Sequence, residues 1–441
     1  MIISCAIILS FIMALILPFA PEWTYDIVKG EFITYLIIII VDILNTKRLT
    51  ILHVWIFSYI YIILSEMLIV SWTDFSHEYT MPIFFYLLAN NLVILGYKLF
   101  KPKYNKKSTS YVVRNSNFLI ASLIALVVVY MVFNFEQVAF TYYFGRDVEF
   151  DNNKNPFFTG LINSFGILAP CFIGYYFKHI KQKSVIYSII LSLPIFIYQF
   201  ILATRFKLLF TILPFIFVTG ISSPSLNNTK KNILFVLILV IFSFTSSILK
   251  ENRHVGQLNS GETTYYENVY ANEDNMDFYQ TCAYNMSPEG IIYMAKKADE
   301  YFASNPLLYG RETAFLLYFW VPRSIWPDKP AQLGSWLIRK TEDVSDAHST
   351  SSGFMGELRA DFGWFSLIFA LFIGLLLKLC DQFIYSFKNN ERNIDYIIAA
   401  VLYCYFFFFV RSPITASTVL IGEFITFYII KRVFFEKQEI K

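Results

Sequence analysis

The sequence predicts an all-α polytopic membrane protein with about twelve transmembrane helices and one large polar loop that contains short helices. Three observations support this fold class. The chain of 441 residues is 56% hydrophobic, 19% aromatic and only 16% charged, which is more apolar surface than a soluble protein of this length can bury. Its apolar residues form runs of about 20 residues, the length that crosses the hydrocarbon core of a bilayer. One long polar interval separates the first nine runs from the last three.

The apolar runs define twelve candidate spans. They cover residues 2–20, 27–44, 50–72, 81–99, 116–135, 157–177, 185–204, 207–221, 232–249, 362–380, 394–411 and 413–430. The second run is interrupted by Lys29, Gly30 and Glu31, and the eighth run is short. The first run has no basic segment before it and a poor cleavage site after it, so we interpret it as a retained span and not as a signal peptide.

Lysine and arginine in the short loops predict the orientation of the chain, because these residues concentrate in cytoplasmic loops. The segment from Lys98 to Arg114 is rich in positive charge, and the loop TDFSHEY on the opposite side carries none. Further basic clusters on the first side are Lys47–Arg48, Lys178–Lys183, Lys230–Lys231 and Lys431–Arg432. Both termini are therefore expected in the cytoplasm. The chain divides into helices 1–9 (1–249), the large outer loop (250–361), and helices 10–12 with a short cytoplasmic tail (362–441).

The arginines do not follow the rule that basic residues concentrate in cytoplasmic loops. Of the twelve arginines, eight fall on the predicted outer side, whereas sixteen of the twenty-four lysines fall on the inner side. The planar guanidinium binds phosphate or carboxylate through two parallel hydrogen bonds, which lysine cannot do. Long loops are exempt from the positive-inside rule, but Arg205 and Arg411 lie in very short turns. The distribution therefore favours an outer site for an anionic ligand.

The outer loop contains two ordered segments. SPEGIIYMAKKADEYFASNP has helical apolar spacing, with Ser287 as the expected N-cap, Pro288 in the first turn and Asn305–Pro306 at the end. We expect its apolar stripe to pack on the membrane surface or on the helix bundle, and we assign it no chemistry. RETAFLLYFWVP is too short to span and is predicted to be interfacial. PRSIWPDKP follows it, and its prolines and tryptophan favour an ordered segment at headgroup depth.

The basic candidates each have a structural alternative. Arg205 and Lys207 lie in an outward turn, where they would hold a diphosphate at the membrane surface or extend to lipid headgroups. Arg323 would contact the same ligand or pair with Asp328 and stack on Trp326. For Asp328 and Lys329, stabilisation of the turn is the favoured interpretation.

The acid–base candidates lie close to the tenth span. His348 can take a proton from a sugar hydroxyl, and Glu357 can do the same or orient the histidine. Glu357 and Asp361 are four residues apart and would share one face of a helix, although for Asp361 a helix-terminus role is favoured. Glu66 and Glu423 lie within spans, where carboxylates are functional candidates or are protonated or paired with tyrosine.

The sequence lacks the common nucleotide and metal motifs. It has no GxxxxGK[ST], GxGxxG, HExxH or DxD sequence, and its cysteines form neither a disulfide framework nor a metal-ligand spacing. We therefore expect no metal, no cofactor and no nucleic-acid partner. An enzyme of this kind would use a preactivated, membrane-borne substrate and neutralise its leaving group with arginines.

The chain resembles the bacterial oligosaccharide repeat-unit polymerases, the Wzy-type O-antigen and capsular polysaccharide polymerases. The resemblance is carried by the twelve predicted spans, the long loop before the last three, PRSIWPDKP, and the HSTSSGFMGELRADFGW entry to the next span. The topology covers the whole chain, whereas the local resemblance is concentrated in residues 311–364, with a weaker one at Arg205 and Lys207.

The resemblance implies a metal-independent glycosyltransferase of the bacterial inner membrane with a periplasmic outer loop. It would transfer a growing glycan from undecaprenyl diphosphate to a new lipid-linked repeat unit. Expected partners are undecaprenyl-diphosphate-linked oligosaccharides, membrane lipid, and a chain-length regulator and flippase of the same pathway. His348 or Glu357 would be the acceptor base. The roles implied for other residues are diphosphate binding by Arg205, Lys207, Arg323 and Arg411, and glycan binding by Trp320, Trp326, Arg311, Arg339 and Arg359.

Three other functions remain open. An O-antigen ligase shares the donor chemistry but transfers the glycan to lipid A-core. A lipid-linked oligosaccharide flippase also has about twelve spans, but its charges should line an inward cavity. A general transporter fits less well, because no inverted repeat or pair of broken helices is evident.

Overall fold

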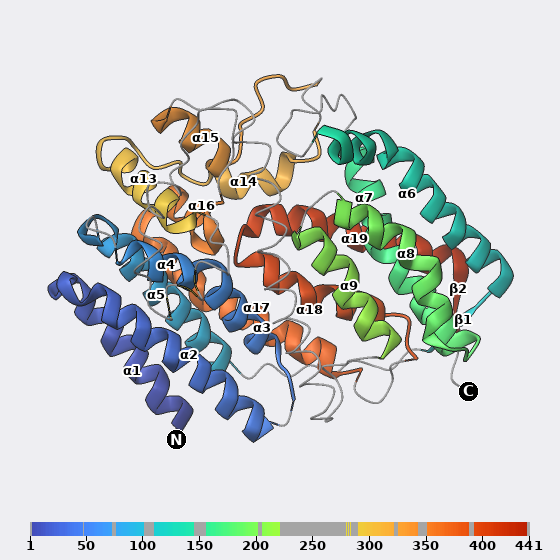
Figure 1. Ribbon diagram of the computed structural model, residues 1–441, viewed down its shortest axis with the longest axis horizontal. Coiled ribbons are helices and arrows are strands. Elements are labelled where there is room, and N and C mark those ends of the chain that lie inside the picture. Colours follow the sequence, from blue (N-terminus) through green and yellow to red (C-terminus); the bar gives the residue numbers. More distant parts are fainter. Residues whose placement is uncertain are drawn as a thin grey trace.

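The protein is a bundle of helices with a second, smaller group of short helices packed across one end (Figure 1). The computed structural model describes residues 2–46, 48–72, 76–100, 110–144, 156–201, 205–220, 279, 281, 283, 290–321, 325–342, 351–387 and 392–438. Statements about structure below refer to these residues, which we call the described residues.

The helices of the bundle follow the predicted apolar runs. In the first half they are α1 (Ile2–Ile16), α2 (Thr24–Thr46), α3 (Ile51–Tyr59), α4 (Ser65–Val70), α5 (Ser76–Leu99), α6 (Ser116–Phe144), α7 (Pro156–Tyr175), α8 (Val185–Ile201) and α9 (Arg205–Thr219). In the last part they are α17 (Leu367–Tyr385), α18 (Tyr396–Phe409) and α19 (Pro413–Phe434). Two π-helical turns continue α3 and α7, η3 (Ile60–Leu64) and η4 (Tyr176–Ile180). Two 3-10 turns follow α1, η1 (Leu17–Phe19) and η2 (Pro21–Trp23).

The group of short helices comes from the predicted outer loop. It comprises α13 (Ile291–Ser304), α14 (Arg311–Tyr318), α15 (Leu333–Thr341), α16 (Gly353–Phe362) and the 3-10 turn η7 (Gly363–Ser366), which leads into α17. These helices lie together at the top of Figure 1, and we call that end of the bundle the loop end. The beginning of α1 lies away from it, and the opposite end of the bundle is called the far end (Figure 1).

The fold is that of an all-α membrane protein. Each predicted span contains a helix, except 232–249, which lies outside the described residues. Among the described residues, four helices are long and apolar enough to cross a membrane, namely Ile51–Val70, His77–Leu99, Ser116–Ala139 and Gly353–Tyr385. Shorter apolar helices cover Ile3–Phe19, Val185–Ile201, Leu208–Thr219 and Tyr396–Phe409. The total of about twelve spans stays a prediction.

Apolar side chains separate a central part of the bundle from its periphery. The helix through Ile51–Val70 is almost wholly buried, whereas α6 and α17 expose much of their apolar surface. On α17, for example, Ile368 and Phe372 are exposed, one turn apart on the same helix face. An exposed apolar stripe of this kind is expected where a helix contacts lipid.

Two glycines allow α5 and α17 to lie in backbone contact. A Cβ atom on Gly96 would lie 2.4 Å from the carbonyl oxygen of Leu371, and one on Gly374 would lie 2.2 Å from that of Val93. Both separations are far below a van der Waals contact. Small residues at helix crossings serve this purpose in membrane proteins, where close packing replaces the hydrophobic drive.

A small sheet that the sequence did not predict closes the far end. Strand β1 (Ser110–Val113) precedes α6 and pairs antiparallel with β2 (Phe435–Gln438), which continues from α19. Arg114 forms an ion pair with Glu436 beside the sheet, with 3.0 Å between Nε and Oε1. The sheet therefore joins the beginning of the sixth helix to the end of the last.

Candidate functional site at the loop end

The loop end is held together by buried carboxylates that cap helices far away in the sequence. The first is Glu66, in α4. Its Oε2 accepts a hydrogen bond from the backbone N–H of Ile291 (2.6 Å), and its Oε1 accepts from Ile292 and Tyr293 (3.0 Å each). These are the N–H groups that the first turn of α13 leaves without a helical partner.

This cap corrects the predicted start of the outer-loop helix. The helix begins at Ile291. Its N-cap residue is Gly290, in a left-handed conformation (φ 73°), which has no side chain to cap the helix. Ser287 and Pro288 lie outside the described residues. As expected, the apolar stripe, which includes Met294 and Ala298, packs on neighbouring helices. The role of Glu66 is thus to join the bundle to α13.

Asp361 and Glu312 form the second and third caps. Asp361 accepts from the backbone N–H groups of Glu312 (3.1 Å) and Thr313 (2.8 Å) at the start of α14, and from the Thr313 hydroxyl (2.7 Å). Glu312 in turn accepts from the N–H of Leu333 at the start of α15 (2.9 Å). The sequence predicts Asp361 at the N-terminus of its own helix, but it lies in the last turn of α16, and the N-terminus that it caps is that of α14.

Arg311 compensates the buried charge of Glu312. Its Nη2 lies 2.8 Å from Glu312 Oε1, and its guanidinium stacks on Trp336 at 4.4 Å. Burial raises the pKa of Glu312, and the ion pair with Arg311 acts in the opposite direction. Arg311 therefore forms an ion pair within the protein. Only part of its side chain is exposed and could contact a glycan.

Glu357 is the fourth buried carboxylate, and it differs from the others. It is only 3% exposed. The hydroxyl of Ser412, just before α19, donates to its Oε1 at 3.1 Å. Its Oε2 has no hydrogen-bond partner of good geometry among the described residues, although the Ser352 side chain and the Ile414 backbone N–H lie close to the carboxyl group. A buried carboxylate oxygen that lacks a donor can still accept a proton, or a hydrogen bond from a hydroxyl group.

Arg411 lies in the turn between α18 and α19, at the same end of the bundle as this carboxylate. Its carbonyl oxygen accepts a hydrogen bond from the Ser351 hydroxyl (2.6 Å), so the segment that enters α16 is fixed to the turn between α18 and α19. Ser412 follows Arg411 directly and contacts Glu357. The turn between α18 and α19 therefore carries Arg411, a predicted phosphate ligand, next to the serine that binds the base candidate Glu357.

Arg205 and Lys207 occupy the first turn of α9, and their side chains lie outside the described part of the structure. Their backbone position is nevertheless informative. Phe210 of α9 contacts Phe408 (5.2 Å between ring centroids), and Phe217 contacts Tyr403 (5.2 Å). The order of these contacts makes α9 and α18 antiparallel, so the first turn of α9 lies at the end of the bundle where Arg411 lies.

Arg359 has a different environment from the one predicted. It is almost buried, its Nη2 pairs with Asp299 Oδ1 of α13 at 2.7 Å, and its guanidinium lies 4.1 Å from the centre of the Phe85 ring. Burial raises the pKa of Asp299, and the neighbouring Arg359 opposes the shift. Arg359 thus joins α13 to α16, while Arg339, in the last turn of α15, is exposed.

The segment after α14 is ordered where it is described. Lys329 donates from Nζ to the carbonyl oxygens of Phe319 (3.1 Å) and Val321 (2.9 Å) just beyond the end of α14, which confirms its turn-stabilising role. Trp320 is exposed and bonds to its own segment, and Trp326 packs on Tyr318. Leu317 and Ile325 are also exposed. Exposed apolar side chains at the end of a short helix and in the segment after it agree with an interfacial position.

Arg323 and His348 lie outside the described residues. Glu423 of α19 is fully buried, and neither of its carboxylate oxygens has a hydrogen-bond partner among the described residues. No group of three or more His, Cys, Asp and Glu side chains in the described part of the chain is arranged to hold a metal ion.

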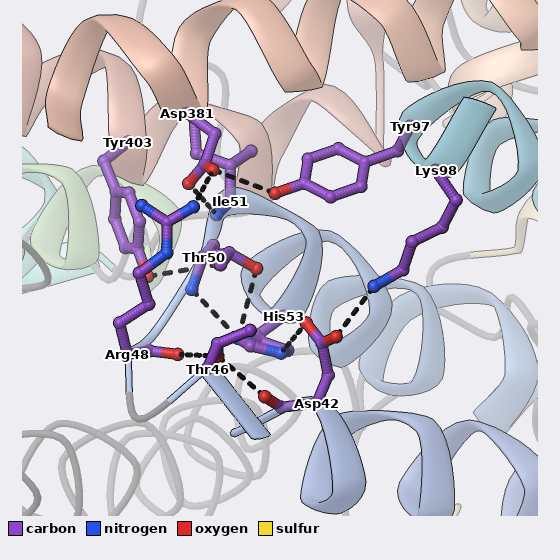
Figure 2. Close-up of polar contacts among 10 residues, drawn as sticks. All are labelled: Asp42, Thr46, Arg48, Thr50, Ile51, His53, Tyr97, Lys98, Asp381 and Tyr403. Carbon is purple, nitrogen blue, oxygen red and sulfur yellow. Dashed lines mark hydrogen bonds and ion pairs between the residues drawn. The ribbon is translucent and has the colours of Figure 1, made fainter. Parts of the chain in front are cut away.

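A second polar cluster, at the far end, was not predicted from the sequence (Figure 2). Asp42 contacts Lys98 Nζ (2.7 Å) and His53 Nε2 (3.0 Å). The backbone N–H of Thr50 donates to His53 Nδ1 (2.9 Å), which places the ring proton of a neutral histidine on Nε2, facing Asp42.

Asp381 is the other acid of this far-end cluster. It accepts from Arg48 Nη2 (2.8 Å) and from the Tyr97 hydroxyl (2.9 Å). In the sequence, Arg48 and Lys98 indicate only which side of the membrane their loops face. Acidic residues near the ends of apolar runs, such as Asp42 and Asp381, were the available signal, because charges at these positions need a partner.

Comparison of the chain with family models, with curated proteins and with solved structures finds no match.

Proposed function

We propose that this protein is a membrane glycosyltransferase that polymerises undecaprenyl-diphosphate-linked oligosaccharide repeat units into an O-antigen or a capsular polysaccharide. The proposal places the loop end at the outer face of the bacterial inner membrane. It rests on the sequence resemblance and on the arrangement of side chains at the loop end.

The observation that carries the proposal is the grouping at the turn between α18 and α19. Glu357 offers a buried carboxylate oxygen without a partner among the described residues. Arg411 lies in the same turn as Ser412, which holds Glu357, and the first turn of α9 with Arg205 lies at the same end. A base beside a set of cations is what transfer from a diphosphate-linked sugar requires.

The proposed reaction is a direct displacement at the anomeric carbon of the donor sugar. The acceptor hydroxyl oxygen forms the new bond to that carbon while the bond to the diphosphate oxygen breaks. The proton of the hydroxyl moves to Glu357 Oε2 or to His348, and the undecaprenyl diphosphate leaves with the bonding electron pair. Arg205, Lys207, Arg323 and Arg411 would stabilise the negative charge that develops on the leaving group, without a metal.

Substitution of Arg411 and Glu357 tests this assignment. Arg411→Ala and Glu357→Gln, expressed in a strain that lacks the gene, should leave the protein in the membrane but reduce the surface glycan to single repeat units. Loss of one preorganised charge in such a site costs about 10²–10³ in rate. Arg432→Ala, an exposed arginine at the far end, is the matched control and should retain full-length polymer. Full-length polymer from both loop-end variants would contradict the proposed site.

Deletion of the gene distinguishes the proposal from its alternatives. Loss of a polymerase leaves one repeat unit on the lipid A-core. Loss of an O-antigen ligase leaves no repeat unit on it, and loss of a flippase retains lipid-linked repeats on the cytoplasmic side. The electrophoretic pattern of the glycan, together with the location of lipid-linked intermediates, separates these outcomes.

A further inference from the structure

A buried polar cluster lies within the bundle, between α1, α2 and α5, none of which carries a proposed catalytic residue. Glu31 is the eighth residue of the 23-residue helix α2 and has no solvent exposure. Ser10 of α1 and Asn91 of α5 are also buried. At 1.5 Å per residue, Glu31 lies about 10 Å along α2 from its first residue and well inside the bundle.

The hydrogen-bond geometry of the cluster constrains where its protons lie. Ser10 Oγ is 2.5 Å from Glu31 Oε2 and 2.7 Å from Asn91 Oδ1. The Tyr35 hydroxyl donates to the same Asn91 oxygen at 3.0 Å. A serine hydroxyl has one proton to donate. If Ser10 donates to Asn91, its contact with Glu31 is a hydrogen bond only when the carboxyl group supplies a proton.

No positive charge faces Glu31. The titratable groups that face it are Tyr35 on the same helix and Tyr59 on α3, and α1 carries no charged residue. Lys29 is two residues away, on another face of α2, and pairs with Asp26. The remaining acidic and basic side chains on adjacent helices all lie elsewhere. His53 and Lys98 pair with Asp42, Glu66 caps α13, and Glu22, His77 and Glu78 lie near the loop end. An ionised carboxylate without a cation is costly at this depth.

The cluster also has unused hydrogen-bonding capacity. Glu31 Oε1 and the side-chain nitrogens of Asn90 and Asn91 have no partner among the described residues. Rotation of the Asn91 amide by half a turn would present its nitrogen to Ser10, and Ser10 would then donate to an ionised Glu31. The same heavy-atom positions therefore fit a protonated and a deprotonated carboxyl group.

We propose that Glu31, Ser10 and Asn91 form a proton-binding site inside the membrane part of the protein. At neutral pH the site holds a proton on Glu31, which donates to Ser10, and Ser10 donates to Asn91. Release of the proton reverses the direction of both hydrogen bonds. Because the three residues belong to α1, α2 and α5, occupancy of the site controls how the first two helices pack on the fifth.

Infrared spectroscopy of the purified full-length protein tests the proposal directly. The spectrum of the wild type minus that of Glu31→Gln at pH 7 should contain the C=O stretch of a protonated carboxylic acid, and this band should shift in D₂O. Ser10→Ala should move the band to higher frequency, because the acid proton loses its acceptor. A difference spectrum with only carboxylate bands would overturn the proposal.

Thermal unfolding gives an independent measurement. Glutamine resembles a neutral glutamic acid in size and polarity, so Glu31→Gln should keep the wild-type Tm at pH 7. In alkaline solution the wild type should lose stability relative to Glu31→Gln, because its carboxyl group ionises without a cation. If Glu31→Gln fails to fold or is less stable at pH 7, the native state uses an ionised Glu31 and the proposal is wrong.

Discussion

Single residues at the loop end carry roles that depend on partners far away in the chain. Glu357 and Asp361 were expected to share one face of a helix, and they do, because both lie on α16. Their chemistry differs with their contacts. The carboxylate of Asp361 accepts three hydrogen bonds, whereas one oxygen of Glu357 has no hydrogen-bond partner in the described part of the structure. The sequence placed both residues, but it could not separate a cap from a candidate base.

Substitution of Glu66 should destabilise the contact between the bundle and α13. Glu66→Ala removes the acceptor of three backbone N–H groups, and the loss of a cap costs about 0.5–2 kcal/mol, with a further cost for leaving buried donors without partners. We expect a lower Tm and faster proteolysis at α13. Glu300→Ala, on an exposed face of the same helix, is the control and should unfold at the wild-type temperature. Equal melting of the two variants would argue against this cap.

At the scale of helices, periodicity predicted position well and boundaries less well. The run 81–99 predicted α5, which in fact begins at Ser76, and the helix expected from Ser287 begins at Ile291. The reason is physical. The apolar pattern records which face is buried, whereas the start of α13 is fixed by Glu66, a residue 225 positions away. The β1–β2 pairing escaped prediction for the same reason, because it joins segments that are distant in sequence.

The crossing of α5 and α17 should tolerate no side chain at Gly374. A Cβ atom there would lie 2.2 Å from the Val93 carbonyl oxygen, so the two helices would have to separate. Gly374→Val should lower the free energy of unfolding by about 1–3 kcal/mol or more, as is typical of overpacking. It should also lower the yield of folded protein. In Gly422→Ala the new methyl group would meet only the Ser164 hydroxyl, at 3.2 Å. That control should be nearly neutral, and an equal loss in both variants would show that glycine content alone is responsible.

The whole molecule is organised by its two ends. Basic residues that predicted the cytoplasmic side gather at the far end, where Arg48, Lys98 and Lys431 pair with acids. The short helices gather at the loop end (Figure 1), and one of them, α16, carries Glu357. The separation of charge along the chain was visible in the sequence. The ion pairs were not, because Arg48 and Asp381 are 333 positions apart.

This separation predicts that damage to the far end changes stability and not glycan length. Asp381→Asn weakens the contacts to Arg48 and Tyr97. Its cost is expected to be about 2–4 kcal/mol, somewhat below that of breaking a fully buried ion pair, because Arg48 is partly exposed. A 24-residue helix such as α5 is about 36 Å long, so Glu357, at the loop end, lies too far from Asp381 for contact. We therefore expect less protein in the membrane and a lower Tm, with the glycan made by each remaining molecule at its normal length.

Two measurements separate stability from chemistry in this variant. The amount of protein in the membrane is quantified by immunoblot, and the glycan length distribution is compared with that of a wild-type strain whose expression is reduced to the same amount. The double variant Asp381→Asn with Arg48→Gln removes the unpaired charge and should recover part of the lost stability. Shorter glycans at equal protein amount would mean that the far end takes part in the reaction, and the two ends would then have to be treated as one functional unit.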